Sequence, residues 1–290
     1  MSAIAAQLFV LLQKLLPKYL LTSVVYRLAR IRIVIIKDFL IRRFVGIYKI
    51  DVEELLHPVP TGYPTFNDFF IRELSPSARD IDQADGSIVS PVDGTVSAAG
   101  RINHDRIFQA KGLDYSLTEL LASDIADAEN YIDGSFATIY LAPYNYHRIH
   151  APVSGNLVAA RYVPGALFSV NEATVGNLPR LFARNERLIC HLETDLGKMV
   201  LIFVGALNVG TINSRWTGDI RPQKQGVVED FDMRKLASAT AFSKGDTIGW
   251  FNMGSTVILL APAGYADNLG ELEAGQTVKM GQPIGQISST

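Results

Sequence analysis

The sequence predicts an α+β protein in which an N-terminal helical layer precedes a mostly antiparallel β domain. Residues 1–62 are rich in Leu, Ile and Val, with charged residues at intervals between the apolar ones. From about residue 87 the pattern changes to short β-branched runs separated by Gly, Pro, Asn and Asp, as in strands joined by turns. The 290 residues suffice for one large domain or two small ones. We expect a helical segment over 1–62 and a β-rich catalytic domain over 63–290.

Within the helical segment, residues 3–16 predict a short apolar helix that ends at Pro17, because proline cannot continue a helix. Residues 19–47 predict one or two further helices. Charged side chains interrupt the segment, so no run reaches the ~18 apolar residues that a membrane span requires. It also lacks the basic start and small-residue cleavage site of a signal peptide.

Basic charge is concentrated in the same segment, although the net charge of the chain is only −2. Residues 1–50 carry nine basic side chains and one acidic side chain, whereas the remainder carries 18 basic and 28 acidic ones. Apolar helices with basic side chains favour an anchor that lies in the membrane surface and meets anionic head groups. The alternative is a helical layer packed on the domain core or in a dimer. So many Leu and Ile neighbours argue against binding to nucleic acid.

The β-rich domain should begin with a helix in Tyr63–Leu74 that has Thr65 as its N-cap. Residues 115–129 predict a helical insertion. The strands are expected at 87–89, 95–97, 136–141, 157–163, 199–204, 247–251 and 256–260. We expect a β sandwich or partly closed barrel.

Two phrases point to a barrel-sandwich hybrid. Ser90–Val96 and Val278–Ile287 resemble the two halves of lipoyl and biotinyl carriers. A carrier presents its modified lysine on an exposed hairpin, whereas Lys279 lies in the phrase that resembles the unmodified half. A carrier module is therefore the weaker interpretation.

The pair Gly254-Ser255 opens a strongly apolar run and leaves 36 residues from Ser255 to the end of the chain. Gly254 has no β-carbon, so its carbonyl is open to attack and its backbone can adopt strained angles. The hydroxyl of Ser255 could attack that carbonyl if a base is near, and the chain would then cut itself. A lone Gly-Ser pair before a strand is more often an ordinary turn.

A serine nucleophile needs a base, usually a histidine held by a carboxylate. His147 and His150 follow an apolar strand, in a segment expected to be a loop at the strand end. The alternatives are two structural histidines or a metal pair, but no third ligand is evident. Asp93 in Ser90-Pro-Val-Asp-Gly-Thr is the best carboxylate, although on local grounds alone a plain Asp-Gly turn explains it better. The single cysteine, Cys190, lies in an apolar run and is expected to be a buried thiol.

These motifs, in this order and with these separations, resemble phosphatidylserine decarboxylase of the bacterial, pyruvoyl-dependent type. Further stretches resemble the same family, and the likeness runs from about residue 15 to the C-terminus: 65–70, 109–112, 162–171, 181–187 and 204–206. Met253 departs from the family, which more often has Leu before the Gly-Ser pair.

The resemblance implies a maturation triad of Asp93, His150 and Ser255 that cuts the chain into 1–254 and 255–290. Ser255 would become a pyruvoyl group, so no pyridoxal phosphate and no metal would be required. The pyruvoyl carbonyl would form a Schiff base with phosphatidylserine and act as electron sink when carbon dioxide leaves. His147 is the candidate to reprotonate the α-carbon and give phosphatidylethanolamine, and the two histidines could also share or exchange their roles.

A lipid substrate implies a peripheral position on the cytoplasmic face of the inner membrane. Arg184 and Arg187 could receive the phosphate, or form a solvated or ion-paired face. The two chains of one precursor would stay together, and the processed units could form a homodimer. The alternative is a serine hydrolase that uses the same three residue types and keeps Ser255 intact; no Gly-x-Ser-x-Gly elbow is present.

Overall fold

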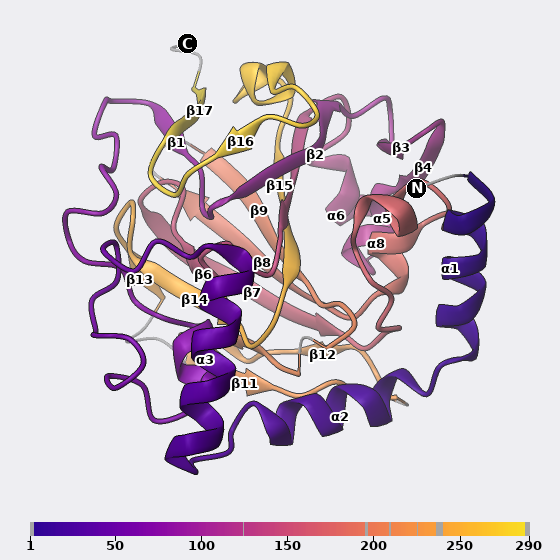
Figure 1. The fold of residues 1–290 in the computed structure, drawn as a ribbon. Helices are drawn as coiled ribbons and strands as arrows, with labels where there is room; N and C mark the ends of the chain where they lie inside the picture. Colours follow the sequence, from indigo (N-terminus) through magenta and orange to yellow (C-terminus); the bar gives the residue numbers. More distant parts are fainter. Residues whose placement is uncertain are drawn as a thin grey trace.

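The computed structural model describes residues 3–123, 125–194, 197–208, 210–224, 226–235 and 240–287. Helices occupy the N-terminal segment and short stretches between strands (Figure 1). They are α1 Ala3–Leu15, α2 Lys18–Leu28, α3 Val34–Tyr48, α4 Phe66–Phe70, α5 Leu117–Leu121, α6 Ile125–Glu129, α7 Glu172–Val175 and α8 Leu181–Arg184, with 3-10 turns at Met233–Lys235 and Asp267–Glu271.

A nine-stranded antiparallel sheet forms the body of the protein, in the order β12-β7-β8-β9-β15-β5-β2-β16, with β13 also on β7. Its strands are β2 Gly94–Arg101, β5 Ser135–Leu141, β7 Gly155–Val163, β8 Arg187–Thr194, β9 Gly197–Val204, β12 Glu229–Asp230, β13 Ala241–Phe242, β15 Ser255–Ala261 and β16 Thr277–Val278. β15 lies between β5 and β9, and all its residues are buried. A strand buried on both faces requires a continuous apolar run, which explains the sequence after Ser255.

Three smaller sheets accompany it in the described part of the chain. One has the order β11-β10-β14-β6, and the others are the pairs β1-β17 and β3-β4. Their strands are β1 Ser87–Val89, β3 Arg106–Ala110, β4 Leu113–Ser116, β6 Arg148–His150, β10 Ile212–Ser214, β11 Gly218–Ile220, β14 Thr247–Phe251 and β17 Pro283–Gln286. The two phrases that resemble carrier halves pair with each other, because Val278 of β16 pairs with Gly94 of β2, and Ser90 exchanges backbone hydrogen bonds with Gly281 and Gln282.

The predicted α+β class with mostly antiparallel strands is confirmed. The described strands close no barrel, since the large sheet has open ends at β12 and β16. The predicted helix at Tyr63–Leu74 is only α4, but Thr65 caps it as expected by accepting from the Asp68 N–H. The predicted helical insertion is present as α5 and α6.

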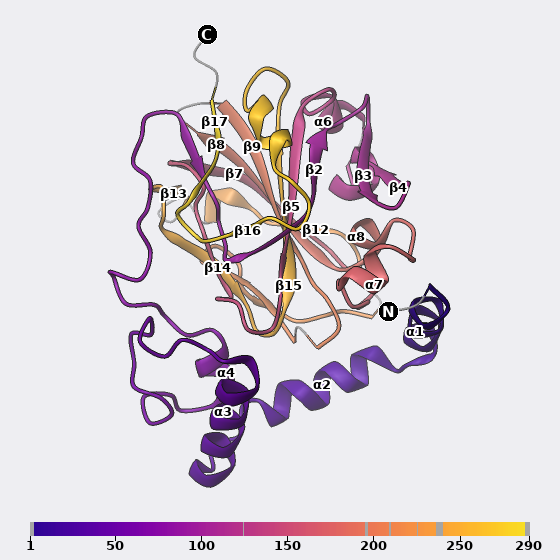
Figure 2. The same ribbon diagram turned by 45° about the horizontal axis from the view of Figure 1, so that its top comes forward.

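The helices α1, α2 and α3 lie along the outside of the β body (Figures 1 and 2). Pro17 separates α1 from α2, and the predicted stretch 19–47 contains two helices, as one of the expected options. A small aromatic core joins α3 to α4, with Ile41, Phe66, Phe69 and Phe70 buried in it. This core has members on both sides of residue 62, and the division into segments 1–62 and 63–290 stays a prediction.

Among the described helices, none is by itself long and apolar enough to cross a bilayer. Taken together, Ile4–Leu15 and Lys18–Leu28 have the length and composition of a membrane span, but the two helices are bent by 85° relative to each other.

Candidate active site

The Gly254–Ser255 peptide lies where the chain enters β15. Ser255 is fully buried, pairs with Leu141 of β5, and donates its hydroxyl hydrogen bond to the Val204 carbonyl of β9. The predicted strand start at this pair is therefore confirmed. The nucleophile candidate lies inside the sheet body, away from bulk water.

Backbone strain lies one residue before the expected position. Met253 has a φ of 138°, a conformation that non-glycine residues rarely adopt and that costs on the order of 1–3 kcal/mol. Gly254 itself is not among the residues with positive φ. Asn252 holds the segment, because its side chain accepts from Asn67 Nδ2 at 2.9 Å and donates to the Thr211 hydroxyl. These side-chain hydrogen bonds therefore hold the backbone in its strained conformation just before the candidate scissile bond.

His147 is the histidine nearest to this peptide. Its Nε2 is 3.8 Å from the position that a β-carbon on Gly254 would occupy. Its Nδ1 lies 2.8 Å from the Asn145 carbonyl, which can only accept, so Nδ1 carries the proton and Nε2 is left as a free acceptor. Nε2 is buried and has no hydrogen-bond partner. Burial, and then the charge of Arg72, lower the pKa of His147 to about 3, so the ring is neutral at physiological pH.

His150 has both ring nitrogens engaged elsewhere. Nδ1 donates to the Gly245 carbonyl at 2.7 Å, and Nε2 lies 2.9 Å from the Tyr146 hydroxyl. His150 belongs to β6, so the expected loop covers His147 but not His150. In this extended segment the two rings meet different partners, as residues three apart on a strand should.

Asp93 lies between β1 and β2, as predicted, and binds Arg79 rather than His150. Its carboxylate accepts from Arg79 Nη2 at 2.5 Å and Nε at 3.1 Å, and from the Met280 N–H at 2.8 Å. The contact with His150 is indirect, since the His150 N–H donates to the carbonyl of Pro91, two residues before Asp93. The structure thus brings His147 to Gly254, but it joins neither Asp93 to His150 nor His150 to Ser255 by a hydrogen bond.

A cavity of about 240 Å³ opens onto the Gly254 peptide. α3 contributes Phe44 and Tyr48 to its wall, and the loops before α7 and β10 contribute Ser169 and Asn208. The amino-acid composition of the N-terminal segment does not predict that α3 lines this pocket. The signal that could have indicated it is the aromatic spacing of Phe44 and Tyr48, which places both on one face of a helix.

The two arginines proposed for phosphate lie in different surroundings. Arg187 is buried, and its guanidinium donates to four backbone carbonyls, those of Leu120, Ala183, Asn185 and Glu119. This placement favours a structural role for Arg187 over the phosphate role. Arg184 is exposed and lines a separate hollow beside Phe168 and Arg180, and its phosphate role stays a prediction.

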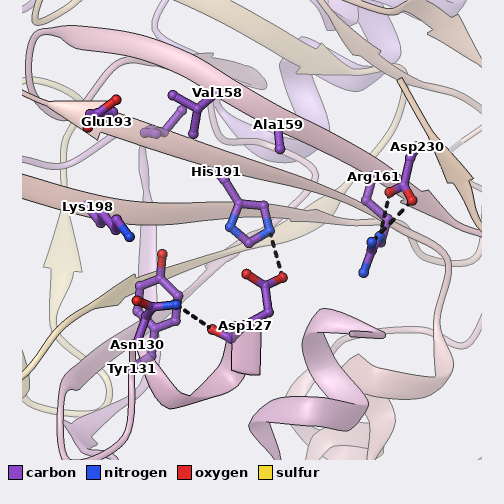
Figure 3. Close-up of a pocket in the computed structure, with 11 residues that line it drawn as sticks. Asp127, Asn130, Tyr131, Val158, Ala159, Arg161, His191, Glu193, Lys198 and Asp230 are labelled. Atoms are coloured by element: carbon purple, nitrogen blue, oxygen red, sulfur yellow. Dashed lines mark hydrogen bonds and ion pairs between the residues drawn. The ribbon is translucent and has the colours of Figure 1, made fainter. Parts of the chain in front are cut away.

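Another hollow, drawn in Figure 3, contains His191 and none of the candidate site residues. There the imidazole Nε2 is 3.8 Å from Asp127 Oδ2, and Arg161 pairs with Asp230 at 2.6 Å. Cys190, beside His191 in sequence, is fully buried as predicted. Among the described residues no group of three or more His, Cys, Asp or Glu side chains could hold a metal ion.

Comparison with known proteins gives matches over most of the chain. The family model described as "Phosphatidylserine decarboxylase" matches residues 66–286, and one described as "PSD" matches residues 8–49. The chain is 44% identical over 283 residues to a phosphatidylserine decarboxylase proenzyme of Marinobacter nauticus, covering 97% of this chain and 98% of the relative. Proenzymes of the same name are 46% identical in Acidovorax ebreus over 275 residues and 45% identical in Chromobacterium violaceum over 279. These alignments cover 95% and 96% of this chain, and 96% and 98% of the two relatives. The chain therefore belongs to the phosphatidylserine decarboxylase family.

Proposed function

We propose that this protein converts phosphatidylserine to phosphatidylethanolamine with a pyruvoyl group that it makes from its own Ser255. The observation that carries the proposal is the Gly254–Ser255 peptide itself. It lies at a pocket wall, directly after the strained Met253, with an unpartnered imidazole nitrogen of His147 beside it. A serine hydrolase acting on external substrates fits less well, because the relatives of this chain are named proenzymes and no Gly-x-Ser-x-Gly elbow is present.

Maturation would begin when the Ser255 hydroxyl attacks the Gly254 carbonyl and the peptide becomes an ester. β-Elimination then breaks the bond between Oγ and Cβ, so the oxygen leaves with the Gly254 carboxylate and residue 255 becomes dehydroalanine. Tautomerisation and hydrolysis by one water release ammonia and leave the pyruvoyl group. Release of the strain at Met253 favours the cut, because the flanking chains are no longer joined.

The pyruvoyl carbonyl would supply an electron sink for decarboxylation of an amino acid head group. The residues present fit such a group. Ser255 begins a buried strand, so water is excluded, and Gly254 opens to the cavity where the substrate would enter.

The two histidines have separable roles in this proposal. His150 serves maturation with Asp93, as the resemblance implies, after it exchanges its bond to Tyr146 for one to Ser255. His147 serves decarboxylation by giving a proton to the substrate α-carbon. Its position next to Gly254 also supports a second candidate, in which His147 is the maturation base.

Cleavage itself would prepare His147 to act as an acid. The cut creates a carboxylate at Gly254, the residue beside His147 Nε2. An opposite charge at such a distance favours the protonated imidazole. His147 would thus be neutral in the precursor and more readily charged in the mature enzyme.

An apolar surface on α1, α2 and α3 supports a peripheral position on the membrane. We define this membrane face by its exposed large side chains: Ile4, Leu8, Leu11, Leu12, Leu15, Leu20, Val24, Leu28, Ile35 and Phe39. Exposed apolar side chains in this number favour a contact with lipid or protein. Exposed Lys14, Arg27, Arg32 and Arg42 could meet anionic head groups, whereas Lys37 is buried against Asp38. We propose binding to the cytoplasmic face of the inner membrane; a homodimer through this face is the alternative occupant.

The test is the intact mass of the purified protein under denaturing conditions, followed by an assay of carbon dioxide release from phosphatidylserine. Two chains are expected, 1–254 and a 36-residue peptide lighter than its serine form by one ammonia. A single active species of 31.8 kDa that hydrolyses esters and releases no carbon dioxide would favour the hydrolase.

A further inference from the structure

Helix α1 has an inverted distribution of polar and apolar side chains. Gln13 is only 1% exposed, and it shares the buried face of the helix with Ala6 and Val10. The opposite face exposes leucines, among them Leu11 at 53% and Leu15 at 77%. A buried polar side chain beneath an exposed apolar face requires a specific partner, because burial of an unpaired amide is unfavourable.

The partners of Gln13 belong to the loop that lines the pocket. Its Oε1 accepts a hydrogen bond from the Ser169 N–H at 2.7 Å, and its Nε2 donates to the Thr174 hydroxyl at 3.0 Å. Ser169 lines the cavity at Gly254, and Thr174 belongs to α7, which follows that loop. One amide on α1 therefore fixes both ends of the segment from Ser169 to α7.

Helix α2 makes an equivalent contact with a second loop of the pocket. The buried Thr22 hydroxyl accepts from the Asn208 N–H at 3.2 Å, and Asn208 lines the same cavity with a φ of 70°. Tyr19 adds a bond from its hydroxyl to the Gly165 carbonyl at 2.6 Å. The two helices that carry most of the membrane face thus hold two of the loops that line the pocket.

We infer that Gln13 and Thr22 are positioning residues through which docking of α1 and α2 on a lipid surface sets the pocket loops and raises turnover. The inference rests on the proposed function and adds a regulation to it. Lipid binding can favour the productive loop arrangement only if the helices contact lipid and loops at once, and these hydrogen bonds provide that connection. The chemical step remains with the groups at Ser255.

The experiment uses the full-length, self-cleaved protein and a short-chain phosphatidylserine dispersed as monomers. Turnover is measured with and without vesicles of phosphatidylcholine and phosphatidylglycerol. The test variants are Gln13→Ala, which removes the hydrogen bonds to Ser169 and Thr174, and Thr22→Val, which removes the one to Asn208. Gln7→Ala and Ser23→Ala are matched controls at exposed positions of the same helices, and Thr22→Ser restores a hydroxyl. Substrate that dissolves in the vesicles changes the measured turnover of every protein equally. The comparison therefore uses the ratio of each variant's turnover to that of the wild type.

The wild type and both controls should turn over faster when vesicles are added. Gln13→Ala and Thr22→Val should be cleaved and should bind vesicles as the wild type does. Their vesicle-stimulated kcat should fall about tenfold, because small displacements of a pocket wall have large effects on rate. Thr22→Ser should recover most of the loss.

Equal stimulation in the wild type and both test variants would overturn the inference and leave the proposed function intact. A wild type that vesicles do not stimulate would overturn it too. A wild type that is cut but releases no carbon dioxide from any phosphatidylserine would instead count against the proposed function.

Discussion

The Nε2 atom of His147 lies 3.8 Å from the position that a β-carbon on Gly254 would occupy. This nitrogen is buried and makes no hydrogen bond, so it is a free acceptor beside the bond that the chain is expected to cut. A methyl group at Gly254 would meet only this nitrogen and the Leu141 carbonyl at 3.6 Å, so glycine is not required there by space. Glycine is expected there for its open carbonyl, and substitutions of the reactive groups around this peptide should leave the fold unchanged.

Ser255→Ala should remain a single chain of 31.8 kDa, because no oxygen is left to attack Gly254. Removing the hydroxyl costs only its bond to the Val204 carbonyl, roughly 1 kcal/mol, so the variant should fold. Denaturing mass spectrometry measures the outcome. Ser255→Cys is the matched control, since a thiol can still attack and should allow partial cleavage. Efficient cutting of Ser255→Ala would show that another group is the nucleophile.

His150→Ala should stay uncut, whereas His147→Ala should be cut but should lose about 10²–10⁴-fold in kcat, the usual contribution of a positioned acid. Gel electrophoresis reports the cut, and carbon dioxide release reports turnover. His191→Ala is the control, because His191 lies in a hollow that contains none of the candidate site residues. The reverse pattern would assign maturation to His147, as its position beside Gly254 allows. Melting temperatures would separate either result from a loss of fold.

The sequence predicts the strands of the main sheet clearly, but it does not predict the small two-stranded sheet of β3 and β4. The runs Met199–Val204 and Thr256–Leu260 predict strands because they are buried on both faces and must be apolar throughout. The hairpin of β3 and β4 was not predicted, because its strands have only five and four residues and their polarity does not follow burial: Phe108 is exposed and Gln109 is buried. Pro17 and Thr65 act locally, which is why the end of α1 and the start of α4 could be foreseen.

The candidate site was predictable where its atoms are adjacent in sequence. Gly254 and Ser255 are neighbours, and Asp93 occupies a turn that its own flanking residues define. The partners of the reactive groups depend on the tertiary fold instead. His150 bonds to Gly245, 95 residues away, and Asp93 bonds to Met280, 187 residues away. No local pattern encodes such contacts, and the same is true of the unpaired nitrogen of His147.

The precursor should lose stability in acid because of His147. Its pKa is about 3 in the folded chain against an ordinary 6.5, so above pH 6.5 the folded and unfolded forms are both neutral. As the pH falls from 6.5 toward 3, only the unfolded chain takes up the proton. The free energy of unfolding should then fall by up to about 1.4 kcal/mol per pH unit from this residue.

Urea unfolding of Ser255→Ala and of Ser255→Ala/His147→Gln between pH 7 and 4.5 measures this loss. The double variant should have the shallower pH dependence. The other histidines are identical in both proteins, so their contributions cancel in the comparison. Parallel curves would mean that His147 is not held neutral by burial.

Cleavage should raise the pKa of His147, because the new Gly254 carboxylate forms next to its Nε2. Nitrogen-edited NMR of the histidine rings can compare the mature wild type with uncut Ser255→Ala. His191 provides an internal control, since its neighbours are the same in both forms. If His147 titrates at the same pH before and after the cut, the carboxylate does not stay beside it. A different proton donor would then be required for decarboxylation.

Replacing the central leucines of the membrane face should release the protein from lipid. The triple variant Leu8→Ser/Leu11→Ser/Leu15→Ser removes three exposed side chains that make no part of the buried stripe of α1. Each buried leucine contributes roughly 1.5–3 kcal/mol to insertion, so affinity for anionic vesicles should fall by at least 10²-fold while the fold is kept. Co-sedimentation with phosphatidylglycerol vesicles measures the affinity, and Val158→Ser, at an exposed apolar position on β7, is the control. Undiminished vesicle binding together with a change from dimer to monomer in light scattering would instead identify this face as a contact between two copies of the chain.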